Sequence, residues 1–180
     1  RRRRPGSPAP GSHFPEVMQY WLMKSEPDEV SIDDLSFAPK QTVPWFGVRN
    51  YQARNFMRDT MQIGDLAFFY HSGGAAPGIA GICEVCSEPY PDPTQFAAPQ
   101  RDFPSAAVNP YFDPKSSPDK PRWWLREVRF VNKSRYLPLA ELRAHPELAN
   151  MRLLARGNRL SITPVSDAEW AFITQELMGQ

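Results

Sequence analysis

Apolar positions along the chain fall into short runs separated by polar turns, and most runs have the length and period of β-strands. Residues 19–24 are apolar on both alternating faces, which predicts a central strand buried on both sides. Pro27 ends that strand, since a central strand cannot lose a backbone donor. Two more apolar runs, 66–70 and 79–85, flank the glycine-rich loop 73–78 and predict a hairpin with a wide tip.

Helical signals lie between these runs. Residues 31–35 predict a short helix capped by a serine, with acidic residues in its first turn. Residues 51–61 predict a helix that buries Phe56 and Met57 and turns Arg54 and Arg58 outward.

The second half of the chain continues the alternation. A strand is predicted over 123–131, with Trp124, Val128 and Phe130 on one face. A helix begins at Pro138, and another strand covers 160–163.

The last helix begins with a capping box formed by Ser166 and Glu169. Proline-rich residues 87–121 predict a long surface excursion. Strands outnumber helices and lie at both ends, so we predict an α+β fold in which the sheet closes into a small barrel with helices at its rim.

Composition supports one well-packed domain over residues 17–180. The 180-residue chain is 41% hydrophobic and 12% aromatic. Residues 1–16, four arginines followed by Pro, Gly, Ser and Ala, predict a disordered arm, either a nucleic-acid tether or a tail without consequence. Without Arg1 to Arg4, the remaining 17 Lys and Arg face 20 Asp and Glu, a charge of −3. Any nucleic-acid binding should therefore come from a local patch and a specific pocket.

The chain has neither an apolar run long enough to cross a bilayer nor a signal-peptide pattern, so we expect no membrane partner. With Cys83 and Cys86 as its only cysteines, it suits a cytoplasmic protein, or a nuclear one in a eukaryote, without structural disulfides. Their C-x-x-C spacing lies on a predicted strand, where the two thiols point apart. Zinc would need two more ligands, so we expect buried thiols and no metal.

His71 and Ser72 invite a hydrolase interpretation with Asp65 as the orienting group. Adjacent residues on an extended chain point apart, however, and no nucleophile elbow is present. We therefore expect no catalytic residues. His71 either presents its edge at the rim of the barrel or fills a structural place there.

Flat rings stand beside hydrogen-bonding side chains in two runs, 45–55 and 68–72, which suits a pocket for a planar polar group such as a nucleobase. Trp45 follows a proline and precedes Gly47, where the backbone can approach a ligand closely. Lys24 and its neighbours Ser25 and Glu26 end the first strand at the same expected mouth, as base and phosphate contacts or as a salt-bridged turn.

Several of these runs resemble the EVE domain: residues 20–27, 45–55, 64–65, 69–72, 77–81 and 160–165. The resemblance extends from about residue 19 to 178. It implies a PUA-like mixed β pseudo-barrel with peripheral helices, and an aromatic-lined cavity that accepts modified bases, modified cytosines among them. The cavity residues that it implies are Trp45, Tyr70 and His71, with Ser25, Lys24, Val48, Asn50 and Ser161 near the polar edge.

The leading hypothesis is a non-enzymatic, monomeric reader of a modified base in DNA or RNA, without a cofactor. Arg49 and Arg54, near the start of the second helix, are the predicted phosphate contacts. An enzyme acting on a modified nucleotide and a binding site for a small planar metabolite remain as alternatives. The salt dependence of binding separates a polymer ligand from a metabolite.

Overall fold

The structure, a computed structural model, describes residues 18–74, 76–96 and 109–179. The predicted arm, 1–16, lies outside the described residues. The helices and strands follow in the order β1 (Tyr20–Ser25), α1 (Ile32–Phe37), β2 (Thr42–Pro44), α2 (Tyr51–Asn55), β3 (Leu66–His71), β4 (Gly78–Val85), β5 (Tyr90–Pro91), β6 (Trp124–Leu125), β7 (Glu127–Pro138), α3 (Leu139–Arg143), β8 (Ile162–Val165) and α4 (Asp167–Phe172). A π-helical turn extends α2 through Phe56–Thr60 and α4 through Ile173–Leu177.

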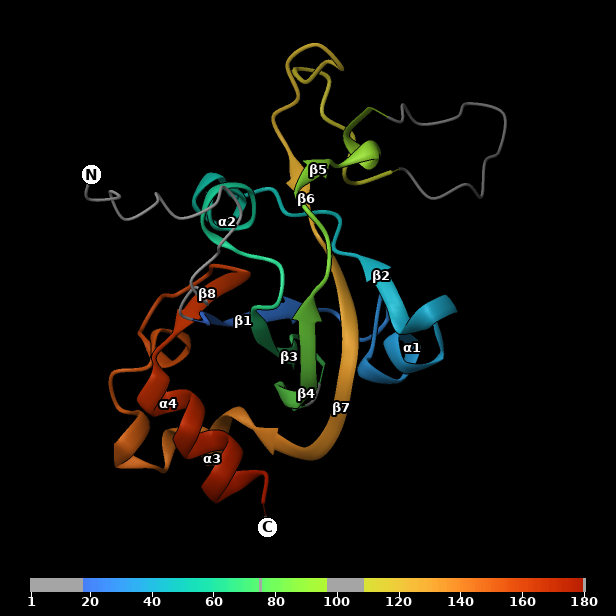
Figure 1. Ribbon diagram of the computed structural model, residues 1–180. Helices are drawn as coiled ribbons and strands as arrows, with labels where there is room; N and C mark the ends of the chain where they lie inside the picture. Colours follow the sequence, from blue (N-terminus) through green and yellow to red (C-terminus); the bar gives the residue numbers. More distant parts are fainter. Residues whose placement is uncertain (1–17, 75, 97–108, 180) are drawn as a thin grey trace, which may run out of the picture.

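Six strands form one mixed sheet in the order β2-β7-β4-β3-β1-β8, and β5 pairs with β6 in a separate two-stranded ribbon. β1 and β3 run parallel, while the other neighbouring pairs in the large sheet are antiparallel. The long β7 curves across the molecule, with α1 on one side of the sheet and α3 and α4 on the other (Figure 1). The fold class is confirmed as α+β and PUA-like. The strand order ends at β2 and β8, so the hydrogen-bonded ladder is that of an open pseudo-barrel.

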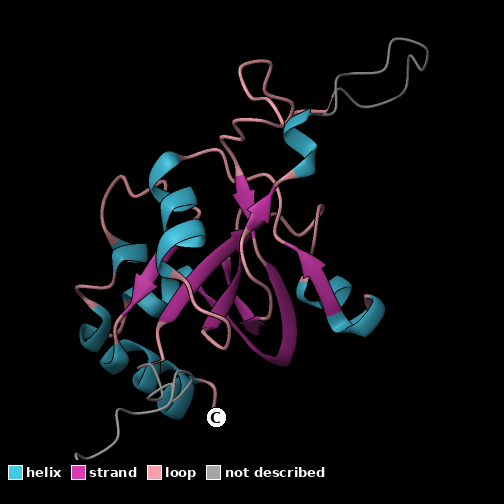
Figure 2. Ribbon diagram, turned by 45° about the horizontal axis from the view of Figure 1, so that its top comes forward, coloured by secondary structure: helices cyan, strands magenta, loops and turns pink. Residues whose placement is uncertain are grey.

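The two faces of β1 and β3 pack into two separate cores, because successive side chains of a strand point to opposite faces. Trp21 and Phe69 belong to a cluster that also holds buried residues of α1 and α2. Leu22 and Phe68 belong to a second cluster, with buried residues of α3 and α4. The strands accordingly lie between peripheral helices (Figure 2), and the prediction of a first strand buried on both sides is confirmed.

Both predicted helix caps are present. The Ser31 hydroxyl accepts from the backbone N–H of Asp34, and the Asp34 carboxylate accepts in turn from the Ser31 N–H. Ser166 and Glu169 form the same reciprocal pair at the start of α4. Each box satisfies amide donors that the first turn of a helix leaves unpaired, which explains why these two starts were readable from the sequence.

The strand predicted over 123–131 is instead two strands, β6 and β7, in different sheets. Arg126 lies between them and is only 3% exposed. Its guanidinium donates to the carbonyls of Met57, Met61 and Ser87, which draws the chain inward and breaks the strand. Trp124 therefore does not share a sheet face with Val128, and the predicted strand over 160–163 is shifted to Ile162–Val165.

Candidate functional site

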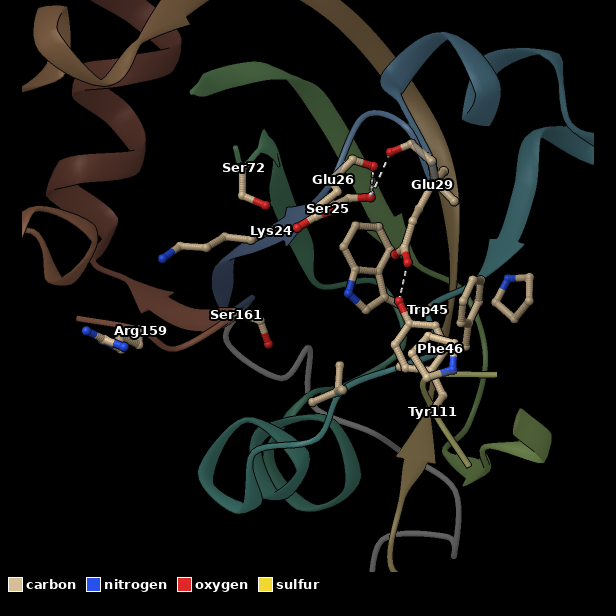
Figure 3. Close-up of a pocket in the computed structure, with 15 residues that line it drawn as sticks. Lys24, Ser25, Glu26, Glu29, Trp45, Phe46, Ser72, Tyr111, Arg159 and Ser161 are labelled. Atoms are coloured by element: carbon tan, nitrogen blue, oxygen red, sulfur yellow. Dashed lines mark hydrogen bonds between the residues drawn. The ribbon is translucent and has the colours of Figure 1, made fainter. Parts of the chain in front are cut away.

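A cavity of about 550 Å³ opens where β1 ends, and we call this cavity the hollow. Five predicted site residues line it: Lys24, Ser25, Trp45, Val48 and Ser161. Other side chains complete the wall, namely Glu26, Glu29, Phe46, Ser72, Tyr111 and Arg159. Figure 3 shows the rings of Phe46 and Tyr111 on one side of Trp45, and the cations of Lys24 and Arg159 on the other.

Backbone pairing brings the polar part of the wall together. The parallel register of β1 and β3 sets Ser25 opposite His71, and the amide of Ser72 donates to the Ser25 carbonyl at 2.9 Å. The amide of Lys24 donates to the carbonyl of Ser161 at 2.8 Å. Three segments distant in sequence therefore end at one mouth, and main-chain bonds fix their spacing.

Trp45 is positioned by its backbone and by one ring contact. Its amide donates to the Arg126 carbonyl at 2.9 Å, which continues the β2 edge into the loop. The indole meets Phe69 edge to face, with ring centroids 5.4 Å apart. The side chain is 6% exposed, so most of its surface is packed and the remainder lines the hollow.

The aromatic end of the hollow is closed by the protein's own Tyr111. Gly47 has φ +85°, and a Cβ added there would lie 2.6 Å from the Tyr111 ring. The close approach that Gly47 permits is therefore to this ring. Tyr111 also meets Phe46 edge to face at 5.5 Å, and its hydroxyl donates to the Glu29 carboxylate. Burial, followed by the bond to Glu29, raises the pKa of Tyr111.

The polar edge carries hydrogen-bonding groups that are not used internally. The side chains of Lys24, Ser72 and Ser161 make no hydrogen bond or ion pair to another described residue. Burial lowers the pKa of Lys24, since its ammonium group is partly withdrawn from water. The Ser25 hydroxyl donates to the Val30 carbonyl at 2.7 Å, so it faces the hollow as an acceptor.

The structure does not bring Tyr70, His71 or Asn50 to the hollow. Tyr70 is 3% exposed and packs in the core cluster shared with α3 and α4. The His71 ring accepts from the amide of Ile32 at 3.1 Å, and burial lowers its pKa. The Asn50 side chain caps α2 by accepting from Ala53. These three residues serve the fold, and the ring beside Trp45 is Phe69.

The two predicted phosphate contacts are also engaged within the protein. Arg49 forms an ion pair with the fully buried Asp92 at 3.1 Å, and its guanidinium donates to the Tyr111 carbonyl at 2.7 Å. Arg54 donates to the Arg122 carbonyl at 2.9 Å and lies over the Tyr51 ring. Both arginines hold the excursion against the core, and Arg49 thereby positions Tyr111.

The groups considered for catalysis are separated by their partners. Asp65 accepts from the Trp21 indole N–H at 3.0 Å and from the Gln62 amide, at the opposite end of β3 from His71. The His71 ring accepts a hydrogen bond from the Ile32 amide at the start of α1, so it does not bridge Asp65 and Ser72. Across residues 18–74, 76–96 and 109–179, no cluster of three or more His, Cys, Asp or Glu is arranged to hold a metal ion.

The predicted pair of buried thiols holds for one cysteine. Cys83 is fully buried in β4, and desolvation raises its pKa to about 12. Cys86 lies just beyond the strand and is partly exposed. Both are free thiols.

Residue types and spacing did not reveal Tyr111 and Arg159 as lining residues. Tyr111 lies in the aperiodic excursion, and Arg159 precedes β8 in a loop. Neither position carries a motif, and only the tertiary fold brings them beside Trp45.

The described part of the chain contains no helix with the length and apolarity that a bilayer crossing requires.

Known proteins match this chain along nearly all of its described residues. Residues 19–176 match the family model of the EVE domain. Human thymocyte nuclear protein 1 is 44% identical over 175 residues, which cover 87% of this chain and 73% of that protein. A crystal structure of human THYN1 protein in complex with 5-methylcytosine-containing DNA superposes with a TM-score of 0.75 at 44% identity, covering 86% of this chain and 95% of that one. A protein from Pseudomonas putida, also 44% identical, gives 0.75 over 86% and 97% of the two chains.

Proposed function

The chain belongs to the EVE domain family, and from that premise we propose that it binds nucleic acid and reads one modified base in the hollow beside Trp45. The crystal structure of a similar human protein with 5-methylcytosine-containing DNA makes a modified cytosine in DNA the first ligand to test. The proposed activity is recognition without chemistry.

The observation that supports this proposal most strongly is the indole of Trp45 on the wall of a hollow with unused polar groups. A volume of about 550 Å³ lies in the range of small-ligand sites, roughly 300–1,000 Å³. Any base has a π-face, so stacking on Trp45 supplies affinity, while Ser161, Ser72 and the Ser25 acceptor supply the edge that discriminates.

A base that stacks on Trp45 inside the hollow would have to leave a duplex. Extrusion costs a few kcal/mol. One stack on an aromatic side chain returns roughly 1–3 kcal/mol, so edge and phosphate contacts must supply the remainder. A single-stranded or mispaired target avoids most of the cost, and we expect such oligonucleotides to bind more tightly than the matched duplex.

The test removes the stacking surface without emptying the space. Trp45→Leu keeps an apolar contact for Phe69 but loses the indole face. We expect it to weaken binding of an oligonucleotide with a single 5-methylcytosine by about 5- to 150-fold, the equivalent of one lost stack. Fluorescence anisotropy with labelled single strands that carry cytosine or 5-methylcytosine measures this loss.

Trp124→Leu is the matched control. Trp124 is partly buried, and it does not line the hollow. If Trp45→Leu binds every oligonucleotide as the wild type does, the stacking role of Trp45 is wrong. If the two variants lose affinity equally while both stay folded, the effect is not specific to the hollow.

A further inference from the structure

A positively charged segment borders the hollow and leads into β8. Residues 148–166 contain Arg152, Arg156 and Arg159 but no Asp or Glu. All three arginines are exposed. We call residues 152–159 the arginine loop. Its positive charge is a local exception, because residues 5–180 carry a formal net charge of −3.

The guanidinium groups of the arginine loop have no internal partner. None of the three makes a hydrogen bond or ion pair to a residue within the described ranges. Outside the loop the Arg122 side chain is likewise unpaired among the described residues, whereas other arginines bind a carboxylate or a carbonyl oxygen: Arg49, Arg54, Arg58, Arg126, Arg129 and Arg135. The donors of the arginine loop are therefore left for an external acceptor.

The backbone that presents these side chains has a defined shape. The Asn158 side chain donates to the Arg152 carbonyl at 2.6 Å and accepts from the Leu160 amide at 3.0 Å. The Asn158 amide donates to the Ala155 carbonyl, and Gly157 takes φ +76° to close the turn. A second, separate cavity of about 330 Å³ lies on the loop, lined by Arg152, Arg156 and Asn158 among others.

This loop is continuous with the hollow beside Trp45. Arg159 and Ser161 line that hollow, and the Ser161 carbonyl accepts from the Lys24 amide. In Figure 3 Arg159 and Lys24 lie away from Phe46 and Tyr111, on the other side of the indole. A polyanion laid along the arginine loop would therefore reach the cationic end of the hollow.

We propose that the arginine loop, together with Lys24, binds the phosphodiester backbone next to the recognised base. This inference rests on the proposed function for its ligand. The planar guanidinium fork suits phosphate oxygens, and unpaired arginines beside a base site match the need for phosphate contacts that set register. Arg49 and Arg54, which are engaged internally, leave this role to the arginine loop.

The salt dependence of binding tests the proposal. Each phosphate contact adds about 0.7 to the slope of log K against log salt for a single strand. The variant R152Q/R156Q/R159Q should therefore flatten the slope by about 2 units and weaken binding of every oligonucleotide at low salt. Anisotropy titrations with an unmodified single strand, at several concentrations of NaCl, measure both quantities.

The control removes the same charge from paired positions. Arg58, Arg129 and Lys133 each form an ion pair with an acidic residue, at side-chain exposures of 34%, 51% and 58%. The variant R58Q/R129Q/K133Q should keep the wild-type slope. A wild-type slope in R152Q/R156Q/R159Q, or an equal flattening in both variants, would overturn the assignment.

The readout stays separate from base recognition, because it uses an unmodified strand. If the protein does not distinguish cytosine from 5-methylcytosine but R152Q/R156Q/R159Q alone flattens the slope, the proposed function fails and the arginine loop stands. If that variant keeps the preference for the modified base with weaker overall affinity, both stand. A third outcome concerns membranes. If the wild type binds phosphatidylserine vesicles as strongly as it binds the oligonucleotide, and R152Q/R156Q/R159Q does not bind the vesicles, the loop is assigned to a membrane surface and the nucleic-acid assignment is overturned.

Discussion

The contact between Gly47 and Tyr111 makes the substitution Gly47→Ala a sharp test of how the hollow is closed. At φ +85° an alanine is in the left-handed region, which costs roughly 1–2 kcal/mol. Its Cβ would also lie 2.6 Å from Cε1 and 2.9 Å from Cζ of the Tyr111 ring, so the ring must move. The substitution therefore combines backbone strain with a steric displacement.

The displacement carries a cost that can be worked out from the contacts of the ring. Leaving the edge-to-face contact with Phe46 forfeits about 0.5–1.5 kcal/mol. Loss of the hydrogen bond to the exposed Glu29 carboxylate adds about 0.5–1.5 kcal/mol. With the backbone strain, we expect Gly47→Ala to lower the free energy of unfolding by about 2–5 kcal/mol.

Urea unfolding, followed by tryptophan fluorescence, measures this value in two backgrounds. In the Tyr111→Ala background the ring is absent, so Gly47→Ala should cost only the backbone part, about 1–2 kcal/mol. The difference between the two backgrounds is the coupling energy between residues 47 and 111. An equal cost in both backgrounds would refute the conclusion that the Tyr111 ring occupies the space above Gly47.

Two further changes probe the half-buried and buried cations. Lys24→Met should stabilise the free protein at neutral pH while weakening oligonucleotide binding, because burial lowers the pKa of Lys24 below its usual 10.5 and so penalises the charged form in the fold. The unfolded chain then binds more protons than the folded one as pH approaches 10.5, so the wild type should regain stability relative to the variant between pH 7 and 10 in urea titrations. A stability difference that does not change over this range would contradict the effect of burial. Arg126→Met should lower the unfolding free energy by at least about 2 kcal/mol, because it leaves buried carbonyls without a donor, whereas Arg129→Met at an exposed pair should cost about 1 kcal/mol or less.

Much of the architecture could be predicted from local signals. Continuous apolar runs predicted β1, β3 and β4, the serine cap of α1 is present, and the predicted capping box of α4 is formed by the residues expected. One departure from the predicted strands is the split between β6 and β7. Arg126 has the appearance of an outward polar residue in a strand, and only its three carbonyl partners, two of them buried, explain why it points inward.

Prediction of the site was less complete, for a geometric reason. Neighbouring strand residues point to opposite faces, so Tyr70 and His71 could not both line one cavity, and Phe69 supplies the ring that meets Trp45. Asn50 directly precedes the predicted helix 51–61, and its side chain is used there as the cap rather than in the hollow. Tyr111 and Arg159 reach the hollow only through tertiary packing, which no local pattern in those segments records.

The pairing of Lys24 with Ser161 has a consequence for the order in which the site is assembled. The hollow draws its wall from positions as far apart as residues 24 and 161, so most of the polypeptide separates its two halves. A ribosome-bound intermediate that has emerged only through β7 has Trp45, Ser25 and Ser72 but lacks Arg159 and Ser161. Ligand capture thus requires synthesis to continue past Ser161, and a truncation directly after β7 should abolish it even where the remaining strands are formed.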